Sequence, residues 1–121
     1  MIPGTWNPTI KQGSTWSWTA SYLDDAAPID LTGYTARMDI VHDDTKRTIL
    51  QLDTDAGGLA IDGVAGTISV TVSAVQTAEL DASAHVYDLE LVADSDPRSA
   101  TAEAVAILEG RITVRPQWTK P

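Results

Sequence analysis

The sequence predicts an all-β fold, an antiparallel β-sandwich built from two packed sheets. Apolar and polar residues alternate with a period of two along most of the 121 residues, which is the pattern of half-buried strands. Clusters of Asp, Gly, Pro and Ser interrupt the alternation at short intervals. Seven or eight short strands with almost no helix bury their apolar faces best as two sheets packed face to face.

Each predicted strand has one face that we expect to point into the core. In "STWSWTASYL" that face carries the aromatic residues, because the opposite face is Ser and Thr. The clearest alternation is in "GTISVTV". In chain order, the inward residues are Trp16, Trp18, Ala20 and Tyr22; Tyr34, Ala36, Met38 and Ile40; Leu50 and Leu52; Ile68, Val70 and Val72; Tyr87, Leu89 and Leu91; and Ala104, Ala106, Leu108, Ile112 and Val114.

The segments between the strands have recognisable turn chemistry. Pro28 fixes its φ and Gly33 permits a turn, so residues 28–33 are predicted to form the corner that directs the next strand. "LAID" (59–62) is a brief strand, and residues 73–80 are predicted to form one helical turn with Ser73 as N-cap. Gly110 lies on the inward face of the last strand, which indicates either a bulge or the close approach of a neighbouring strand.

The chain divides into a β-sandwich domain at 13–115 and two extended terminal arms, at 1–12 and 116–121. Both arms are rich in Pro, and each carries a tryptophan, Trp6 or Trp118, that we expect to pack on this domain or on a neighbour. The last strand is apolar on both faces around Val105 and Ile107, which favours an edge or outer-face contact with another chain. These four residues are the candidate partner-binding residues.

Composition excludes several classes of function. The net charge is −9, from 17 acidic and 8 basic residues, so a phosphate backbone would be repelled and nucleic-acid binding is not expected. There is no cysteine, and no apolar run approaches the ~20 residues that span a bilayer. The N-terminus has neither part of a signal peptide, so we expect a chain that is made in the cytosol and kept or assembled from there.

Nothing in the sequence indicates a catalytic or metal site, so we expect no enzyme activity and no cofactor. His42 and His85 have no evident carboxylate or nucleophile partners, and we interpret them as structural or surface residues. "DTDAGG" (53–58) resembles the start of a calcium loop, but the twelfth position is Val64 and not glutamate, so a turn is the better interpretation. A weak surface cation site at Asp53, Asp55 and Asp62 stays open.

The order of these segments resembles a known family. "DLTG" after Pro28, "GTISV" at 66–70, "YDLE" at 87–90 and "LEGRITV" at 108–114 occur in a chain that is similar, over residues 11–120, to the immunoglobulin-like structural proteins of tailed bacteriophages. Within this family, it is similar to the N-terminal domain of phage baseplate upper proteins. The resemblance implies an immunoglobulin-like sandwich whose motifs mark strands and turns.

The function implied by the resemblance is that of a non-enzymatic virion structural protein. It would act as a tail, baseplate or fibre-attachment adaptor, binding other virion proteins and copies of itself, and would be assembled into the virion in the host cytoplasm. A capsid decoration protein is the first alternative. The second is a carbohydrate-binding module, in which Trp16 and Trp18 or the terminal tryptophans stack on host glycans.

Overall fold

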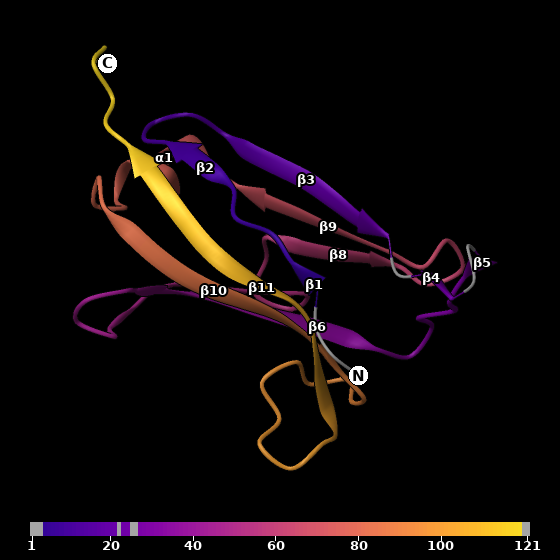
Figure 1. The fold of residues 1–121 in the computed structure, drawn as a ribbon. Helices are drawn as coiled ribbons and strands as arrows, with labels where there is room; N and C mark the ends of the chain where they lie inside the picture. The colour runs from indigo at the N-terminus through magenta and orange to yellow at the C-terminus, as the bar shows by residue number, and fades with distance from the viewer. Residues whose placement is uncertain (1–3, 22, 25–26, 120–121) are drawn as a thin grey trace.

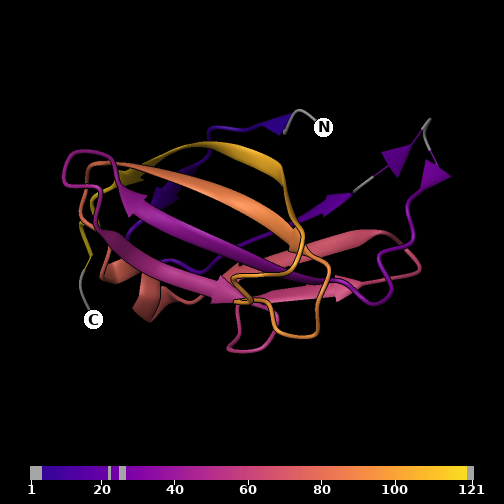
Figure 2. The same ribbon diagram turned by 90° about the horizontal axis from the view of Figure 1, so that it is seen from below.

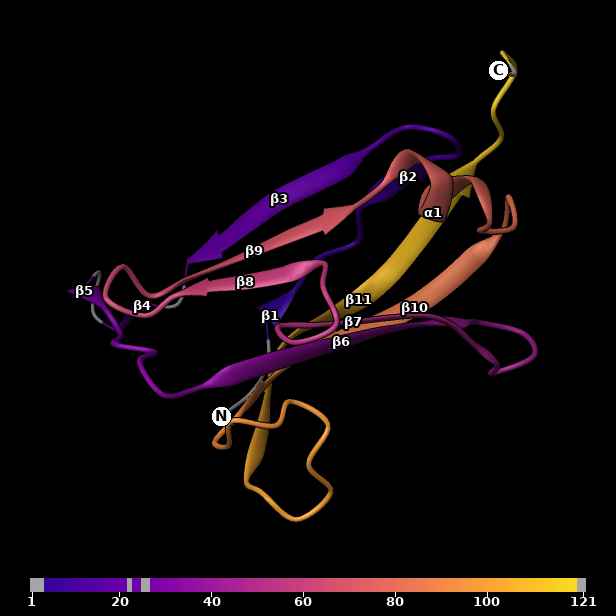
Figure 3. The same ribbon diagram turned by 180° about the vertical axis from the view of Figure 1, so that it is seen from behind.

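Two β-sheets pack face to face, and the smaller sheet lies over the larger one (Figure 1; Figure 3 from behind). The computed structural model describes residues 4–21, 23–24 and 27–119; the expected place of Tyr22 lies outside them. The elements are β1 (Gly4–Thr5), β2 (Thr9–Lys11), β3 (Trp16–Ser21), β4 (Leu23–Asp24), β5 (Ala27–Pro28), β6 (Thr35–His42), β7 (Thr48–Asp53), β8 (Leu59–Asp62), β9 (Thr67–Val72), α1 (Ala74–Ala78), β10 (Ala84–Val92) and β11 (Ala104–Arg115).

The strand order explains how the layers form. The larger sheet runs β1-β11-β10-β6-β7, with β2 also paired to β11, and the smaller runs β3-β9-β8. The short strands β4 and β5 pair only with each other among the described residues. The predicted all-β sandwich is therefore confirmed.

The core lies between the two sheets and uses the predicted inward faces. Each fully buried aliphatic side chain contributes about 1.5–3 kcal/mol to folding, so this layer supplies most of the stabilisation. Its members on the main strands include Ala36, Met38, Ile40, Leu52, Ile68, Val70, Val72, Tyr87, Leu89, Leu91, Ile112 and Val114. The prediction is wrong for Tyr34, which is 42% exposed and lies in a turn before β6, where its N–H donates to the Leu31 carbonyl. It is also wrong for Ala104, which is exposed at the start of β11.

The predicted corner and helical turn both form. Gly33 has φ +88°, and the Asp30 carboxylate accepts hydrogen bonds from the N–H and hydroxyl of Thr32. In α1, Ser73 is the N-cap: its hydroxyl accepts from the N–H of Gln76, whose side chain accepts from the N–H of Ser73. This capping box satisfies two N–H groups that a five-residue helix would otherwise leave unpaired.

The N-terminal segment differs from the expected arm. Within residues 4–11, β1 and β2 both pair parallel with β11, with Gly4 opposite Leu108 and Thr9 opposite Thr113. Ile10 joins the core at 1% exposure. A strand of three residues is too short for its alternation to be recognised in the sequence. The two prolines of the segment are typical of an extended arm, which is why an arm was predicted. Residues 1–3 lie outside the described chain.

β11 has a bulge three residues before Gly110, and Gly110 itself has a separate role. The register with β10 changes between Leu89 and Glu90, whose partners are Leu108 and Ala106, so Ile107 is the extra residue of a bulge. At Gly110 a Cβ atom would collide with the carbonyl of Trp6. Of the two predicted alternatives, the close approach is therefore the one found at Gly110 itself.

A loop at 93–103 connects β10 to β11 on the outer side of the larger sheet (Figure 2). The Arg98 side chain fixes this loop to the sheet. The Arg98 guanidinium donates to Asp39 at 2.8 Å, to Asp53 at 3.0 Å and to the Leu52 carbonyl at 3.1 Å. Arg37 adds two bonds to loop carbonyls, at 3.3 and 3.1 Å. Hydrogen bonds that involve a charged group are stronger than those between neutral groups, so these contacts give the loop a defined position.

Candidate interaction surfaces

Three tryptophans from two segments, Trp6 near the N-terminus and Trp16 and Trp18 on β3, form an aromatic cluster at one side of the sandwich. The rings of Trp6 and Trp16 are stacked with centroids 6.1 Å apart and planes 16° apart, and Trp18 meets Trp6 edge-on at 4.7 Å. Trp16 and Trp18 project from β3 and are only half-buried against the core. The prediction that they point inward is confirmed, but they form the border of the core and not its centre.

Trp6 is fixed in this cluster through its backbone. Its N–H donates to the Glu109 carbonyl at 3.0 Å, and its own carbonyl accepts a 2.8 Å hydrogen bond from the Tyr87 hydroxyl. Burial raises the pKa of Tyr87 to about 12, so the phenol stays protonated and remains a donor. Of the two expected positions of Trp6, on this domain or on a neighbour, the structure shows the first, with the side chain 39% exposed.

Val105 and Ile107 lie in the N-terminal half of β11. Both are half-buried and pack against the core cluster, so they do not form the free apolar outer face that we expected. Because the bulge at Ile107 changes the phase of the strand, Val105 pairs with the buried Leu91 and Ala106 pairs with Glu90, so the predicted inward position of Ala106 is wrong.

Trp118 is the most exposed of the candidate residues and lies far from Val105. It belongs to the segment 116–119, which leaves the sandwich beyond the end of β11 (Figure 1). Its side chain is 80% exposed. Since a strand rises about 3.3 Å per residue, Val105 and Arg115 are roughly 33 Å apart. The four predicted partner-binding residues therefore do not form one surface.

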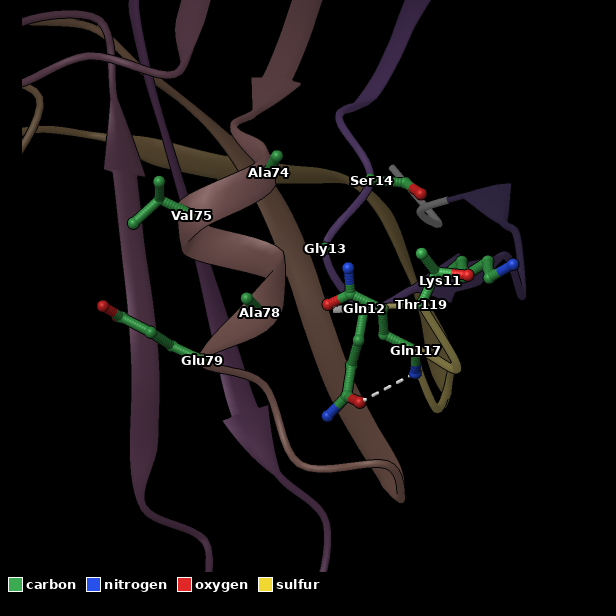
Figure 4. Close-up of a pocket in the computed structure, with 10 residues that line it drawn as sticks. All are labelled: Lys11, Gln12, Gly13, Ser14, Ala74, Val75, Ala78, Glu79, Gln117 and Thr119. Atoms are coloured by element: carbon green, nitrogen blue, oxygen red, sulfur yellow. Dashed lines mark hydrogen bonds between the residues drawn. The ribbon is translucent and has the colours of Figure 1, made fainter. Parts of the chain in front are cut away.

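A hollow of about 910 Å³ lies at the end of the sandwich from which the segment 116–119 leaves (Figure 4). One wall is α1, with Ala74, Val75 and Ala78, and the other is the turn between β2 and β3. Gln12 connects the two walls to the tail: its side chain donates to the Leu80 carbonyl at 2.5 Å and accepts from the Gln117 N–H at 3.2 Å. Sequence reasoning missed this hollow.

Val75 is the residue of this hollow that a sequence signal could have revealed. It is a β-branched residue on a five-residue helix, at a position that faces away from the buried Thr77, and it is 72% exposed. A large apolar residue on the outer side of a capped helical turn is unusual enough to suggest a contact surface.

The two histidines come together in the structure. Their rings meet edge-on with centroids 5.3 Å apart, and His85 is fully buried. Burial lowers the pKa of His85, and the neighbouring His42 acts in the same direction. Neither ring nitrogen of His85 has a hydrogen-bond partner among the described residues. The interpretation of His85 as a structural residue fits this position in the core.

Ser83, His42 and Asp81 lie close enough to suggest a catalytic triad, but their geometry is wrong for one. His42 Nδ1 accepts from the N–H groups of Asp44 and Thr45, both at 3.2 Å, so in the neutral ring Nε2 carries the proton. That same Nε2 faces both the Ser83 hydroxyl, at 3.3 Å, and the Asp81 carboxylate, at 3.8 Å. It cannot act as the base that accepts a proton from Ser83.

The outer face of the larger sheet is acidic. Asp39 and Glu109 lie on either side of Asp88 in one row across three strands. Burial raises the pKa of Asp88, and the nearby charges of Glu90, Asp39 and Glu109 add to this effect. Arg37 balances part of the charge through a 2.8 Å bond to Glu90. This arrangement favours cationic partners over anionic ones.

The resemblance of 53–58 to a calcium loop has a structural explanation. The Asp53 carboxylate accepts from the N–H groups of Asp55 and Ala56, as in a turn, and its second oxygen pairs with Arg98. The turn interpretation is therefore confirmed. Within the described ranges, no group of three or more acidic or histidine side chains is placed to hold a metal ion.

In the part that the structure describes, no helix is long and apolar enough to cross a bilayer. No family model matches the sequence, and no curated protein matches it either.

Proposed function

We propose that this chain is a non-enzymatic structural protein of a tailed-phage particle that works through protein–protein contacts. The observation that carries the proposal is Trp118, whose indole is 80% exposed on a segment that leaves the sandwich. An indole in water is costly and gains most when it is buried against a partner, which makes Trp residues common at the centres of interfaces. The family resemblance supplies the kind of partner, namely other virion proteins and copies of this chain.

The proposed place in the particle is the tail, where the chain would act as a baseplate or fibre-attachment adaptor in a virion assembled in the host cytoplasm. The alternative within the same class is a decoration protein on the capsid. Both roles need a stable sandwich that presents a contact segment, and neither needs an active site. The acidic outer face would select neighbours that carry basic groups.

Antibody-gold labelling of purified particles from the parent phage, read by electron microscopy, tests the proposal. Label at the tail tip or the fibre base is the expected result. Label distributed over the head would make the chain a decoration protein. Particles without label, prepared from a lysate in which the chain is detected, would contradict a virion role.

A carbohydrate-binding role is the second candidate, and the partly exposed ring of Trp6 favours it. Trp6 already covers one face of Trp16, so of these two rings Trp6 is the one with more surface to offer a sugar. Host polysaccharide should then shift the tryptophan emission of the wild-type protein and have no effect on a Trp6→Leu variant. An unchanged wild-type spectrum across a panel of host sugars would exclude this role.

A further inference from the structure

β3 is an edge strand whose outer edge has no partner in the part of the chain that the structure describes. It forms one border of the smaller sheet, and no other strand lies beyond it (Figure 1; Figure 3 from behind). Among the described residues, no backbone hydrogen bond joins β3 to a segment other than β9. Alternate residues of an edge strand direct their N–H and C=O groups outward, so β3 presents a row of main-chain donors and acceptors.

β3 also lacks the features that usually prevent an edge strand from pairing with another chain. The other edges of the two packed sheets each have one. Pro8 separates β1 from β2, Ile49 is the extra residue of a bulge in β7, and β8 is only four residues long and ends in Asp62. By contrast, β3 has six residues in unbroken register with β9 and contains no proline, no charged residue and no bulge. Of these edges, β3 is therefore the one best suited to accept a further strand.

The inner side of β3 is less well covered than that of its neighbour. The inward residues of β9 are fully buried, whereas their partners on β3, Trp16, Trp18 and Ala20, are only half-buried. A strand added beside β3 would place its inward side chains next to these residues, at the distance of cross-strand neighbours. Apolar side chains at those positions would gain most, because they would remove further apolar surface from water.

The outer side of β3 consists of hydroxyl side chains that already pair across the sheet. The Ser17 hydroxyl lies 3.4 Å from that of Thr71 on β9. The Thr19 hydroxyl lies 3.2 Å from that of Ser69. Ser or Thr at the outward positions of an added strand would continue these rows, and cross-strand pairs of this kind stabilise a sheet. The two sides of β3 together favour a strand that alternates apolar and hydroxyl residues.

The charge of the chain selects among such strands. The chain has a net charge of −9, and none of the charged residues lies on β3 itself. A second copy would bring a further charge of −9, so two copies repel each other, whereas a segment that carries basic groups is attracted. The charge therefore favours a basic segment of a different protein over a second copy of this chain.

We propose that β3 binds an extended basic segment of a partner protein, which adds to the smaller sheet as a fourth strand. The main-chain groups of β3 would supply the affinity, and the half-buried rings of Trp16 and Trp18 would select apolar side chains at alternate positions. This inference deepens the proposed adaptor role and rests on it for the identity of the partner as another virion protein.

Amide hydrogen exchange of the full chain, read by NMR, tests the inference. The probe is a capped nine-residue peptide of alternating Thr and Val between two terminal Lys residues. At saturating peptide, alternate amides within residues 16–21 should exchange roughly 10-fold more slowly or less, because they gain hydrogen-bond partners. The amides of β8 at the opposite edge of the same sheet are the internal control and should not change.

Two N-methylated versions of the peptide separate strand addition from unspecific adhesion. An extended peptide directs alternate N–H groups to opposite edges, so methylation of one alternate set removes the donors that face β3. That version should bind roughly 10-fold more weakly or worse, and methylation of the other set should leave most of the affinity. Equal binding of the parent and both methylated peptides would contradict strand addition.

A peptide with Glu in place of both terminal Lys residues tests the choice of a basic partner. It should bind roughly threefold more weakly or worse at low salt, because the chain is acidic. Equal binding of the basic and acidic peptides would overturn that choice.

The remaining outcomes separate strand addition from the virion role. No slowing of exchange in β3 at about 1 mM peptide overturns strand addition. Slow exchange in β3 without peptide, increasing with protein concentration, would show that a second copy occupies the edge and would overturn the partner. Gold label on particles together with no peptide binding would remove only strand addition. Strand addition with no label on particles would remove only the virion role.

Discussion

The hydroxyl of Tyr87 donates a 2.8 Å hydrogen bond to the carbonyl oxygen of Trp6, and so joins the middle of β10 to a segment 81 residues earlier in the chain. Together with the Trp6 N–H bond to Glu109, it holds the N-terminal segment over the aromatic rings of β3. The position of Trp6 in the aromatic cluster thus depends on Tyr87, which is not a member of the cluster.

Removing that hydroxyl should loosen the N-terminal segment. Tyr87→Phe keeps the buried ring and deletes the donor, so we expect a loss of about 0.5–1.5 kcal/mol in the free energy of unfolding, measured with urea. Tyr34→Phe is the control, because Tyr34 is exposed and should lose nothing. Equal effects of the two substitutions would show that the Tyr87 hydroxyl has no special role.

A methyl group at position 110 should displace the N-terminal segment by a steric clash. The added Cβ of Gly110→Ala would collide with the Trp6 backbone, and we expect destabilisation of about 1–3 kcal/mol. Tryptophan emission should also change, because the Trp6 ring would lose its contact with Trp16. Gly4→Ala on β1 is the control, since its Cβ would meet Leu108 at an ordinary 3.5 Å. Wild-type stability for Gly110→Ala would contradict this packing.

Arg98 should stabilise the protein in a pH-dependent manner. Arg98→Ala removes bonds to Asp39 and to Asp53, which is 6% exposed, and should cost about 1–3 kcal/mol at neutral pH. The control is Arg47→Ala, because Arg47 is exposed and its side chain has no ion pair among the described residues.

The sign of the pH effect follows from Asp53. Burial alone would raise the pKa of Asp53, but the N–H groups of Ala56 and Asp55 and the Arg98 guanidinium outweigh it and lower the pKa below 3.8. This carboxylate stabilises the fold above pH 3.8, and the stabilisation is lost as the pH falls through its folded-state pKa. The difference between wild type and Arg98→Ala should therefore shrink in acid. A difference that is constant with pH would contradict the ion pair.

His85 should make the protein less stable as the pH falls below 6.5. Burial lowers its folded-state pKa, so between that value and 6.5 the unfolded chain binds a proton that the folded chain does not. Stability is then full above pH 6.5 and falls with decreasing pH across this interval. Urea titrations at pH 7.5, 6.5 and 5.5 should show this slope in the wild type, and a smaller slope in His85→Leu. Parallel curves for the two proteins would exclude His85 as the source.

The sheet layers were predictable because strand alternation is a local signal. Ile68, Val70 and Val72 point inward as expected, since each lies two residues from the next in a regular strand. Ser73 with Gln76 three residues later likewise specified the helical turn through local hydrogen bonds. Each of these two signals lies within a stretch of eight residues or fewer.

The contacts that position the candidate surfaces were not predictable, because they join distant segments. Nothing near Trp6 indicates that it pairs beside Glu109, and nothing near Arg98 indicates that it reaches Asp39 and Asp53. The hollow beside α1 depends on Gln12 meeting Gln117 across 105 residues. Val105 and Ile107 were misjudged for a related reason, since a bulge changes the phase of β11 without a glycine to mark it.

The parallel pairing of β1 and β2 with β11 has a consequence for how the protein is made. Trp6 is synthesised about a hundred residues before Glu109, its backbone partner. At translation rates of about 5–20 residues per second, the nascent chain spends roughly 5–20 s with this indole unpaired. Once β3 has been made, the rings of Trp16 and Trp18 lack the Trp6 contacts of the folded protein, and their apolar surface is open to other nascent chains. The speed of synthesis therefore sets how long each new chain is open to aggregation.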